Sequence, residues 1–159
     1  MLFLGIDPGY AIVGYGVVEK KQRNFIAREY GTITTSANTS IEIRLEKIHR
    51  DLKKLIKEIQ PDVVAVEELF FYKNIKTAID VGQARGVIVL TAQLSRTPIM
   101  EFTPLQVKQA LTGYGRADKQ QMQRMVQSLL KLKTLPQPDD AADALAIALC
   151  AAQSWRSKM

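Results

Sequence analysis

The chain has 159 residues, of which 47% are hydrophobic and 24% are charged, and it carries a net charge of +6 at pH 7. This composition is ordinary for a globular protein, and without internal repeats or low-complexity tracts it predicts one domain over residues 1–159. A pI near 9.5 favours an acidic partner such as nucleic acid, although a solvated basic surface alone would give the same charge.

The N-terminal part of the chain predicts three strands. Residues 2–6 form an apolar run, and Asp7-Pro8-Gly9 would end this strand with turn chemistry. Further strands are expected at 13–18 and 25–34. The short spacing between the three runs favours an antiparallel meander.

A helix and a central strand follow. Regularly spaced Ile and Leu residues in 41–59 predict an amphipathic helix, which Thr39 or Ser40 would cap. The continuous apolar run at 62–66 predicts a buried strand that is parallel to the first one.

The rest of the chain alternates between helices and one strand. Expected elements are a helix at 77–94, a strand at 99–102 and helices at 104–111, 119–130 and 140–155. A meander followed by such alternation is typical of an α/β fold with a mixed five-stranded sheet and helices on both faces.

The compartment is predicted from two features of the sequence. No stretch approaches the roughly 20 apolar residues of a membrane span, and the N-terminus lacks a basic segment before its short apolar run. We therefore expect a cytoplasmic protein without a membrane partner. The single Cys150 is expected to be a buried thiol, and the single His49 excludes a histidine-rich zinc site.

Four carboxylates are placed where they predict chemistry. Asp7 and Glu67 follow two apolar strands, and active sites of such sheets lie beyond the carboxyl ends of the strands. Asp140 and Asp143 are three residues apart, so they share one face of the last helix. Because an unpaired buried charge is costly, their convergence would call for a cation.

Other interpretations of these acidic residues exist. Asp7 could form a turn with Pro8-Gly9, and acidic residues favour a helix N-terminus through the helix dipole. We interpret Asp139 as the helix cap and Glu68 as a solvated neighbour of Glu67. The small residues Ala141, Ala142 and Ala144 would let a large polyanion approach the last helix.

Oxygen-only ligands suit Mg²⁺ or Mn²⁺. Two such ions, about 3.5–4 Å apart, can stabilise the attacking and leaving oxygens of a phosphodiester. The sequence therefore predicts two ions in one active site that acts on a nucleic-acid backbone.

Basic residues near a glycine-containing loop are candidate DNA contacts. Lys108 and Lys119 flank the loop at 112–115, an arrangement that suits phosphate contact, although both could be solvated surface lysines. Arg116 lies between them and is a further candidate.

Three aromatic residues, Phe70, Phe71 and Tyr72, follow the strand that ends at Glu67. Exposed aromatics beside a basic surface can stack on unpaired bases, and we expect at least one of the three to be in the core. Further on, Gly82 and Gly86 put small residues on one helix face, which would pack either on a second copy of the chain or on its own sheet.

Several motifs together resemble the RuvC family of bacterial Holliday-junction resolvases over essentially the whole chain. They are Gly5-Ile6-Asp7-Pro8-Gly9, Ala65-Val66-Glu67-Glu68, Gly82-Gln83-Ala84-Arg85-Gly86, Gln106-Val107-Lys108-Gln109 and Asp140-Ala141-Ala142-Asp143-Ala144-Leu145-Ala146.

The resemblance implies a ribonuclease H-like homodimer that cuts four-way DNA junctions by two symmetric, Mg²⁺- or Mn²⁺-dependent nicks. It implies that Asp7, Glu67, Asp140 and Asp143 bind the metal and catalyse the reaction. It also implies that Lys108 and Lys119 contact DNA near the cut, that Phe70 contacts bases at the junction centre, and that RuvA and RuvB are partners.

Two hypotheses from other classes compete with an endonuclease. A nucleotide-binding fragment of the actin or sugar-kinase type would also begin with a strand like Gly5-Ile6-Asp7, but it needs a second lobe for which this chain is too short. A DNA-binding module without activity would have little reason to keep a costly cluster of charges.

Overall fold

The computed structural model describes residues 1–68 and 75–155. In these residues one mixed sheet has the strand order β3-β2-β1-β4-β5. β1 pairs antiparallel with β2 and β2 with β3, whereas β4 lies parallel to β1 and β5 parallel to β4. The predicted meander and the parallel central strand are confirmed. The strands are β1 (Leu2–Asp7), β2 (Ile12–Lys21), β3 (Asn24–Thr34), β4 (Val63–Glu67) and β5 (Ile99–Phe102).

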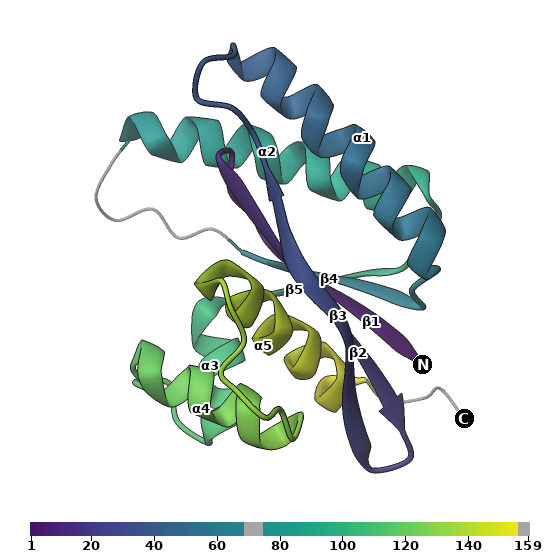
Figure 1. Cartoon of the computed structure of the whole chain (residues 1–159), viewed down its shortest axis with the longest axis vertical. Coiled ribbons are helices and arrows are strands. Elements are labelled where there is room, and N and C mark those ends of the chain that lie inside the picture. The colour runs from purple at the N-terminus through teal and green to yellow at the C-terminus, as the bar shows by residue number, and fades with distance from the viewer. Residues whose placement is uncertain (69–74, 156–159) are drawn as a thin grey trace.

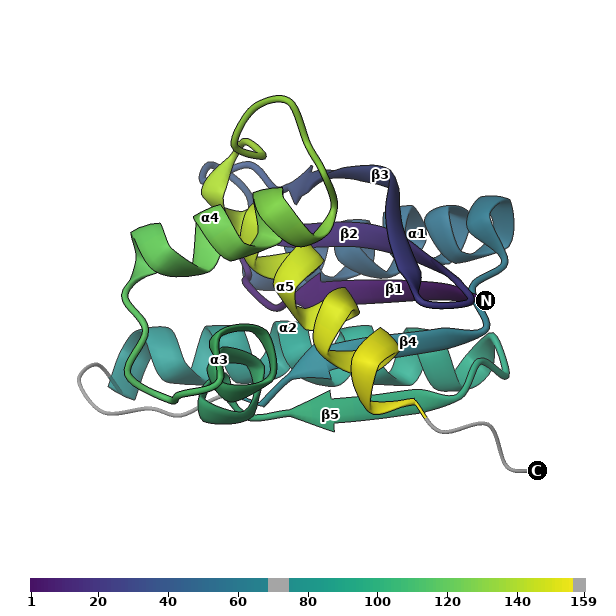
Figure 2. The same ribbon diagram turned by 90° about the horizontal axis from the view of Figure 1, so that it is seen from below.

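Helices cover both faces of the sheet, as predicted (Figure 1). On one face lie α1 (Ile41–Ile59) and α2 (Ile75–Leu94). On the other face lie α3 (Pro104–Thr112), α4 (Lys119–Leu129) and α5 (Asp139–Ser154). Figure 2 shows α5 crossing in front of the sheet, with α1 and α2 behind it. None of the described helices is both long and apolar enough to cross a membrane.

The alternation of side chains along β1 separates two hydrophobic cores. Leu4 and Ile6 point toward α1 and α2, and Phe3 points toward α5, because successive side chains of a strand lie on opposite faces. Ile48 and Leu52 of α1 are fully buried in the first core, so the predicted apolar face of this helix is its packing face.

Several element boundaries differ from the sequence prediction. β2 continues three residues beyond the predicted end, to Lys21, because the backbone pairing with β3 persists although Glu19, Lys20 and Lys21 are polar. Ser40, one of the two predicted candidates, is the N-cap residue of α1, but its side chain makes no capping hydrogen bond.

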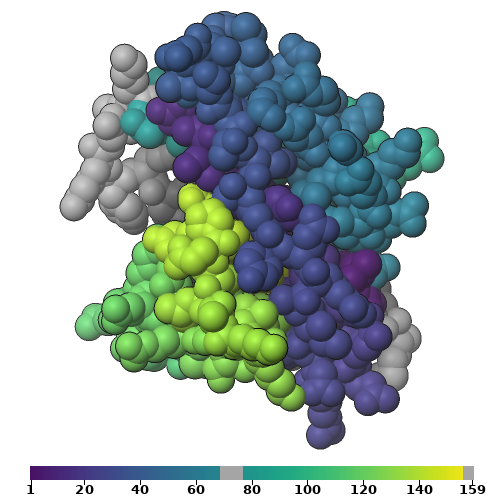
Figure 3. Space-filling model, viewed as in Figure 1, coloured from purple at the N-terminus to yellow at the C-terminus, as the bar shows by residue number. Residues whose placement is uncertain are grey.

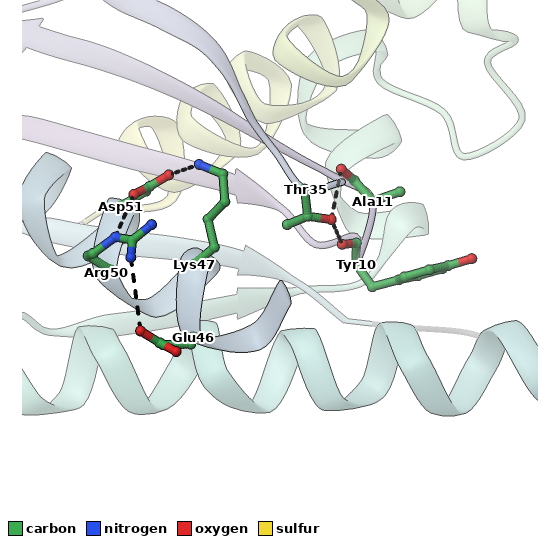
Figure 4. Close-up of polar contacts among 7 residues, drawn as sticks. All are labelled: Tyr10, Ala11, Thr35, Glu46, Lys47, Arg50 and Asp51. Carbon is green, nitrogen blue, oxygen red and sulfur yellow. Dashed lines mark hydrogen bonds and ion pairs between the residues drawn. The ribbon is translucent and has the colours of Figure 1, made fainter. Parts of the chain in front are cut away.

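Figure 4 shows hydrogen bonds in the turn after β1 and ion pairs along α1. Thr35 donates from its Oγ1 to the Tyr10 carbonyl at 2.6 Å and from its backbone N–H to the Ala11 carbonyl at 2.9 Å. These bonds fix the turn that follows Asp7. On α1, Lys47 and Arg50 form ion pairs with Asp51.

Candidate active site

Glycines on β1 and β2 let α5 lie directly on the sheet. A Cβ at Gly5 would come within 2.1 Å of the Ala144 carbonyl oxygen, and one at Gly14 within 2.0 Å of the Asp140 carbonyl oxygen. At Gly16 a Cβ would lie 2.7 Å from the backbone nitrogen of Leu145. No larger residue fits at these positions, so the three glycines bring the start of α5 next to the end of β1.

The alanines of α5 serve the same close packing. Ala141, Ala142 and Ala144 are at most 1% exposed. The prediction that they leave room for an approaching polyanion is therefore wrong, because their small side chains face the protein interior instead of solvent. Helix α5 packs against β2 and β3, and Figure 3 shows the yellow-green surface around its start beside β3.

Asp7 and Glu67 end neighbouring parallel strands on the same face of the sheet. β1 and β4 pair with Ile6 opposite Val66, so the next residues along, Asp7 and Glu67, are side by side. Phe3 and Ala65 belong to the core on the α5 side of the sheet. Asp7 is four residues after Phe3 and Glu67 is two residues after Ala65, so both carboxylates lie on that side as well.

A pocket lies between these strand ends and the helices α3, α4 and α5. Its lining includes Asp7, Glu67 and Asp143 together with Lys108 and Lys119. Apolar residues complete it, namely Pro104, Val107, Met122 and Ala146. Among the predicted site residues that the structure describes, Asp140 and Arg116 do not line the pocket.

The carboxylates of the pocket strongly affect one another. Burial, followed by the negative charges of Glu67, Asp143 and Asp140, raises the pKa of Asp7 to about 8. Burial and the charge of Asp143 raise the pKa of Glu67 to about 7, against the opposing effect of Lys108. Burial is also the main reason why the pKa of Asp143 is raised. Asp140 acts at the edge of this cluster through its charge.

Lys119 connects α4 to the start of α5. Its Nζ lies 2.9 Å from Oδ2 of Asp139 and 3.9 Å from Oδ2 of Asp143. The hydrogen bond to Asp139 is the main cause of the raised pKa of Lys119, and it lowers the pKa of Asp139. Lys119 is thus part of the carboxylate cluster and still more than half exposed.

The interpretation of Asp139 as the helix cap is wrong. Pro138 occupies the cap position, and Asp139 is the first residue of α5. Its carboxylate accepts a hydrogen bond from Nε2 of Gln123 at 2.9 Å besides pairing with Lys119. Gln123 is only 9% exposed and was missed by sequence reasoning, because a glutamine within an amphipathic helix gives no local signal of its partner.

The other predicted contact residues have varied positions. Lys108 lies on α3 at the pocket, whereas Arg116 is exposed in the loop between α3 and α4. Phe70, Phe71 and Tyr72 fall outside the described residues. Gly82 and Gly86 do not pack on the sheet of their own chain, since a Cβ at either position would meet no atom within 4 Å.

The donor chemistry of the cluster fits a hard divalent cation. All four carboxylates offer oxygen ligands, and a bound cation would relieve the repulsion between their negative charges. In residues 1–68 and 75–155, no three His, Cys, Asp or Glu side chains are already arranged to hold a metal ion.

Comparison with known proteins gives a consistent result. Residues 3–151 match the family described as crossover junction endodeoxyribonuclease RuvC. A protein of that name from Halothermothrix orenii is 54% identical over 156 residues, which are 98% of this chain and 94% of the relative.

Solved structures agree with this match. The structure of Thermus thermophilus RuvC has a TM-score of 0.88 and 38% identity, with 96% of this chain and 94% of that chain covered. T. thermophilus RuvC in complex with a Holliday junction substrate also has a TM-score of 0.88, with 35% identity over the same shares. The predicted ribonuclease H-like fold is confirmed, and a nuclease is favoured over the kinase-type and silent-module hypotheses. The chain belongs to the RuvC family of crossover junction endodeoxyribonucleases.

Proposed function

We propose that this nuclease resolves four-way DNA junctions with Asp7, Glu67, Asp140 and Asp143 as its catalytic carboxylates. The observation that carries the proposal is the convergence of Asp7, Glu67 and Asp143 from β1, β4 and α5 on one pocket. There burial and the negative charges of Glu67, Asp143 and the adjacent Asp140 raise the pKa of Asp7 to about 8. A strained charge cluster of this kind, in a cleft, is typical of a functional site.

The four side chains would hold Mg²⁺ or Mn²⁺, and we infer two ions per site. When bound, such ions stabilise the attacking and leaving oxygens of a phosphodiester and favour deprotonation of a water. The protein's part is to fix the carboxylates on rigid elements. Asp7 is held by its pairing with Gly14 of β2, and Glu67 by its pairing with Phe102 of β5. Asp140 and Asp143 are held by a helix that is seated on glycines.

Basic residues around the pocket would bind the DNA backbone. Lys108 and Lys119 line the pocket and would contact phosphates near the cut. Arg116, exposed between them in sequence, would extend this contact outward. By family resemblance, Phe70 would contact bases at the opened junction centre, and RuvA and RuvB would be partners of this enzyme in the cytoplasm.

A homodimer would supply the two active sites that paired nicks require. An apolar stripe along α2 supports a second copy as its partner. Ile79 is 59% exposed and Leu90 is 55% exposed, and the open glycines Gly82 and Gly86 lie between them along the same helix face. Small residues within such a stripe permit close approach of two helices.

Changing Asp7→Asn tests the catalytic proposal. The amide keeps the size of the side chain but loses the anionic ligand, so cleavage of a labelled four-way junction with Mg²⁺ should fall by about 100-fold or more. Junction binding without metal should persist, because the basic residues are unchanged.

Asp51→Asn is the matched control. Asp51 lies on α1, on the other face of the sheet, where it pairs with Lys47. This variant should cleave like the parent, and a linear duplex should remain uncut by both. Full junction cleavage by the Asp7→Asn variant would refute the proposed catalytic set.

A further inference from the structure

The sheet has a gap in its hydrogen bonding next to Glu67. With Ile6 opposite Val66 in a parallel pair, the carbonyl of Glu67 would accept its ladder bond from the backbone N–H of residue 8. Residue 8 is proline, which has no N–H to give. The pairing of β1 with β4 accordingly ends at Ile6 and Val66, one residue before the two carboxylates.

Arg85 fills this gap from the opposite face of the sheet. Its Nε donates to the Glu67 carbonyl at 3.2 Å. Its Nη2 lies 2.5 Å from Oε2 of Glu101, on the neighbouring strand β5. The guanidinium therefore connects α2 with the ends of β4 and β5, directly behind the carboxylate pocket.

The contacts of Arg85 are suited to fixing an orientation. A guanidinium is a planar fork whose donors have fixed directions, and here one donor holds a backbone carbonyl while another is anchored by a carboxylate. The Arg85 side chain is only 23% exposed, so little freedom remains to it. On its other side, β4 is held beyond Glu67 by the Glu68 N–H, which donates to the Phe102 carbonyl at 2.8 Å.

We propose that Arg85 is a positioning residue that sets the direction of the Glu67 side chain by holding the Glu67 carbonyl where Pro8 leaves it without a ladder partner. This inference rests on the proposed role of Glu67. Rotation of the Glu67 peptide would move the carboxylate that is attached to the same Cα. Partners of ligand residues commonly affect activity by about 10-fold to 100-fold when they are removed.

The test compares Arg85→Met, Arg85→Lys and Glu101→Gln in the full-length protein. Arg85→Met should slow single-turnover cleavage of a saturating junction about 10-fold to 100-fold, with an unchanged Kd for the junction in EDTA. Arg85→Lys keeps a cation for Glu101 and should recover part of the rate. Glu101→Gln keeps the guanidinium and should have a smaller effect than Arg85→Met.

Arg28→Met is the matched control. Arg28 pairs with Glu19 across β3 and β2, at the end of the sheet where Glu19 lies opposite Leu2. Loss of that pair should leave the rate unchanged, because it is far from the ends of β1 and β4 that carry Asp7 and Glu67.

Amide hydrogen exchange gives a readout that is independent of cleavage. In metal-free Arg85→Met, the Glu68 amide should exchange faster, whereas the Val64 amide, which donates to the Pro98 carbonyl at 2.9 Å, should not change. Parental cleavage by Arg85→Met, or an equal loss in Arg28→Met, would overturn the inference. Full activity of Glu67→Gln would instead refute the proposed function.

Discussion

The chemistry of single residues in this protein is dominated by two carboxyl groups that hold protons near neutral pH. The pKa of Asp7 is raised to about 8 and that of Glu67 to about 7, in both cases chiefly by burial. An unfolded chain loses these protons near the ordinary values of 3.8 and 4.5. Between these limits the folded state binds more protons than the unfolded state.

This difference predicts how stability depends on pH in the absence of metal. A carboxyl group whose pKa is raised by folding contributes fully to the free energy of unfolding below about pH 4. This contribution is lost as the pH rises toward about 8. Asp7→Asn removes the Asp7 part of this loss. The free energy of unfolding of the variant minus that of the parent, both measured in EDTA, should therefore rise by about 3 kcal/mol from about pH 5 to about pH 8.

Urea unfolding at both pH values measures this change. Mg²⁺ should restore the parent at the higher pH, because a cation binds the ionised carboxylates and stabilises the folded state. A parent whose stability, measured in EDTA, stays constant over this range would contradict the raised pKa values.

Among the structural elements, α5 decides whether the active site forms. It brings Asp140 and Asp143 to the strand ends only because β1 and β2 present glycines beneath it. The helix is built from alanines that are buried over most of its length. The close packing of α5 on the glycines is therefore what places Asp140 and Asp143 at the active site.

Replacing Gly14 by alanine tests this dependence. The added Cβ would lie 2.0 Å from the Asp140 carbonyl oxygen, so α5 must shift. We expect a loss of about 1–3 kcal/mol in the free energy of unfolding and a lower cleavage rate in the variant that remains folded.

Thr34→Ala serves for comparison, because Thr34 is exposed at the end of β3. It should change stability by about 0.5 kcal/mol or less. Equal stability of Gly14→Ala and the parent would show that α5 does not need this close contact.

Patterns of apolar residues predict most elements of this fold, but not the contacts between them. The sequence placed Asp7 and Glu67 at strand ends, and the structure agrees, because strand ends depend on local runs and turn residues. Asp139 looked like a cap since its partners Lys119 and Gln123 lie on another helix. The prediction that the alanines of α5 face an approaching polyanion is wrong for a similar reason, because local sequence does not reveal which face of a helix packs on the sheet.

On the scale of the whole molecule, charge and symmetry determine how a junction would be bound. A net charge of +6 predicts binding that weakens as salt rises, because bound phosphates release counterions. The stripe on α2 and the carboxylate pocket lie on opposite faces of the sheet. A dimer formed through α2 would leave both pockets open to DNA.

Substitution of the stripe tests the dimer. Ile79→Glu combined with Leu90→Glu should shift the protein from dimer to monomer in sedimentation velocity, since burying unpaired carboxylates in an apolar seam is costly. Cleavage should then yield single nicks in place of paired ones. Ile43→Glu, at an equally exposed position of α1, should remain dimeric. A dimer that survives the double substitution would place the interface elsewhere.

The seating of α5 on β1 and β2 also orders events during protein synthesis. β1 and β4, with Asp7 and Glu67, leave the ribosome long before residues 140 and 143. A nascent chain that has emerged only as far as α4 thus has two of the four carboxylates and an uncovered row of glycines. Translation must pass the start of α5 before the pocket can exist, so the DNA-cutting site is assembled only after α5 has been made.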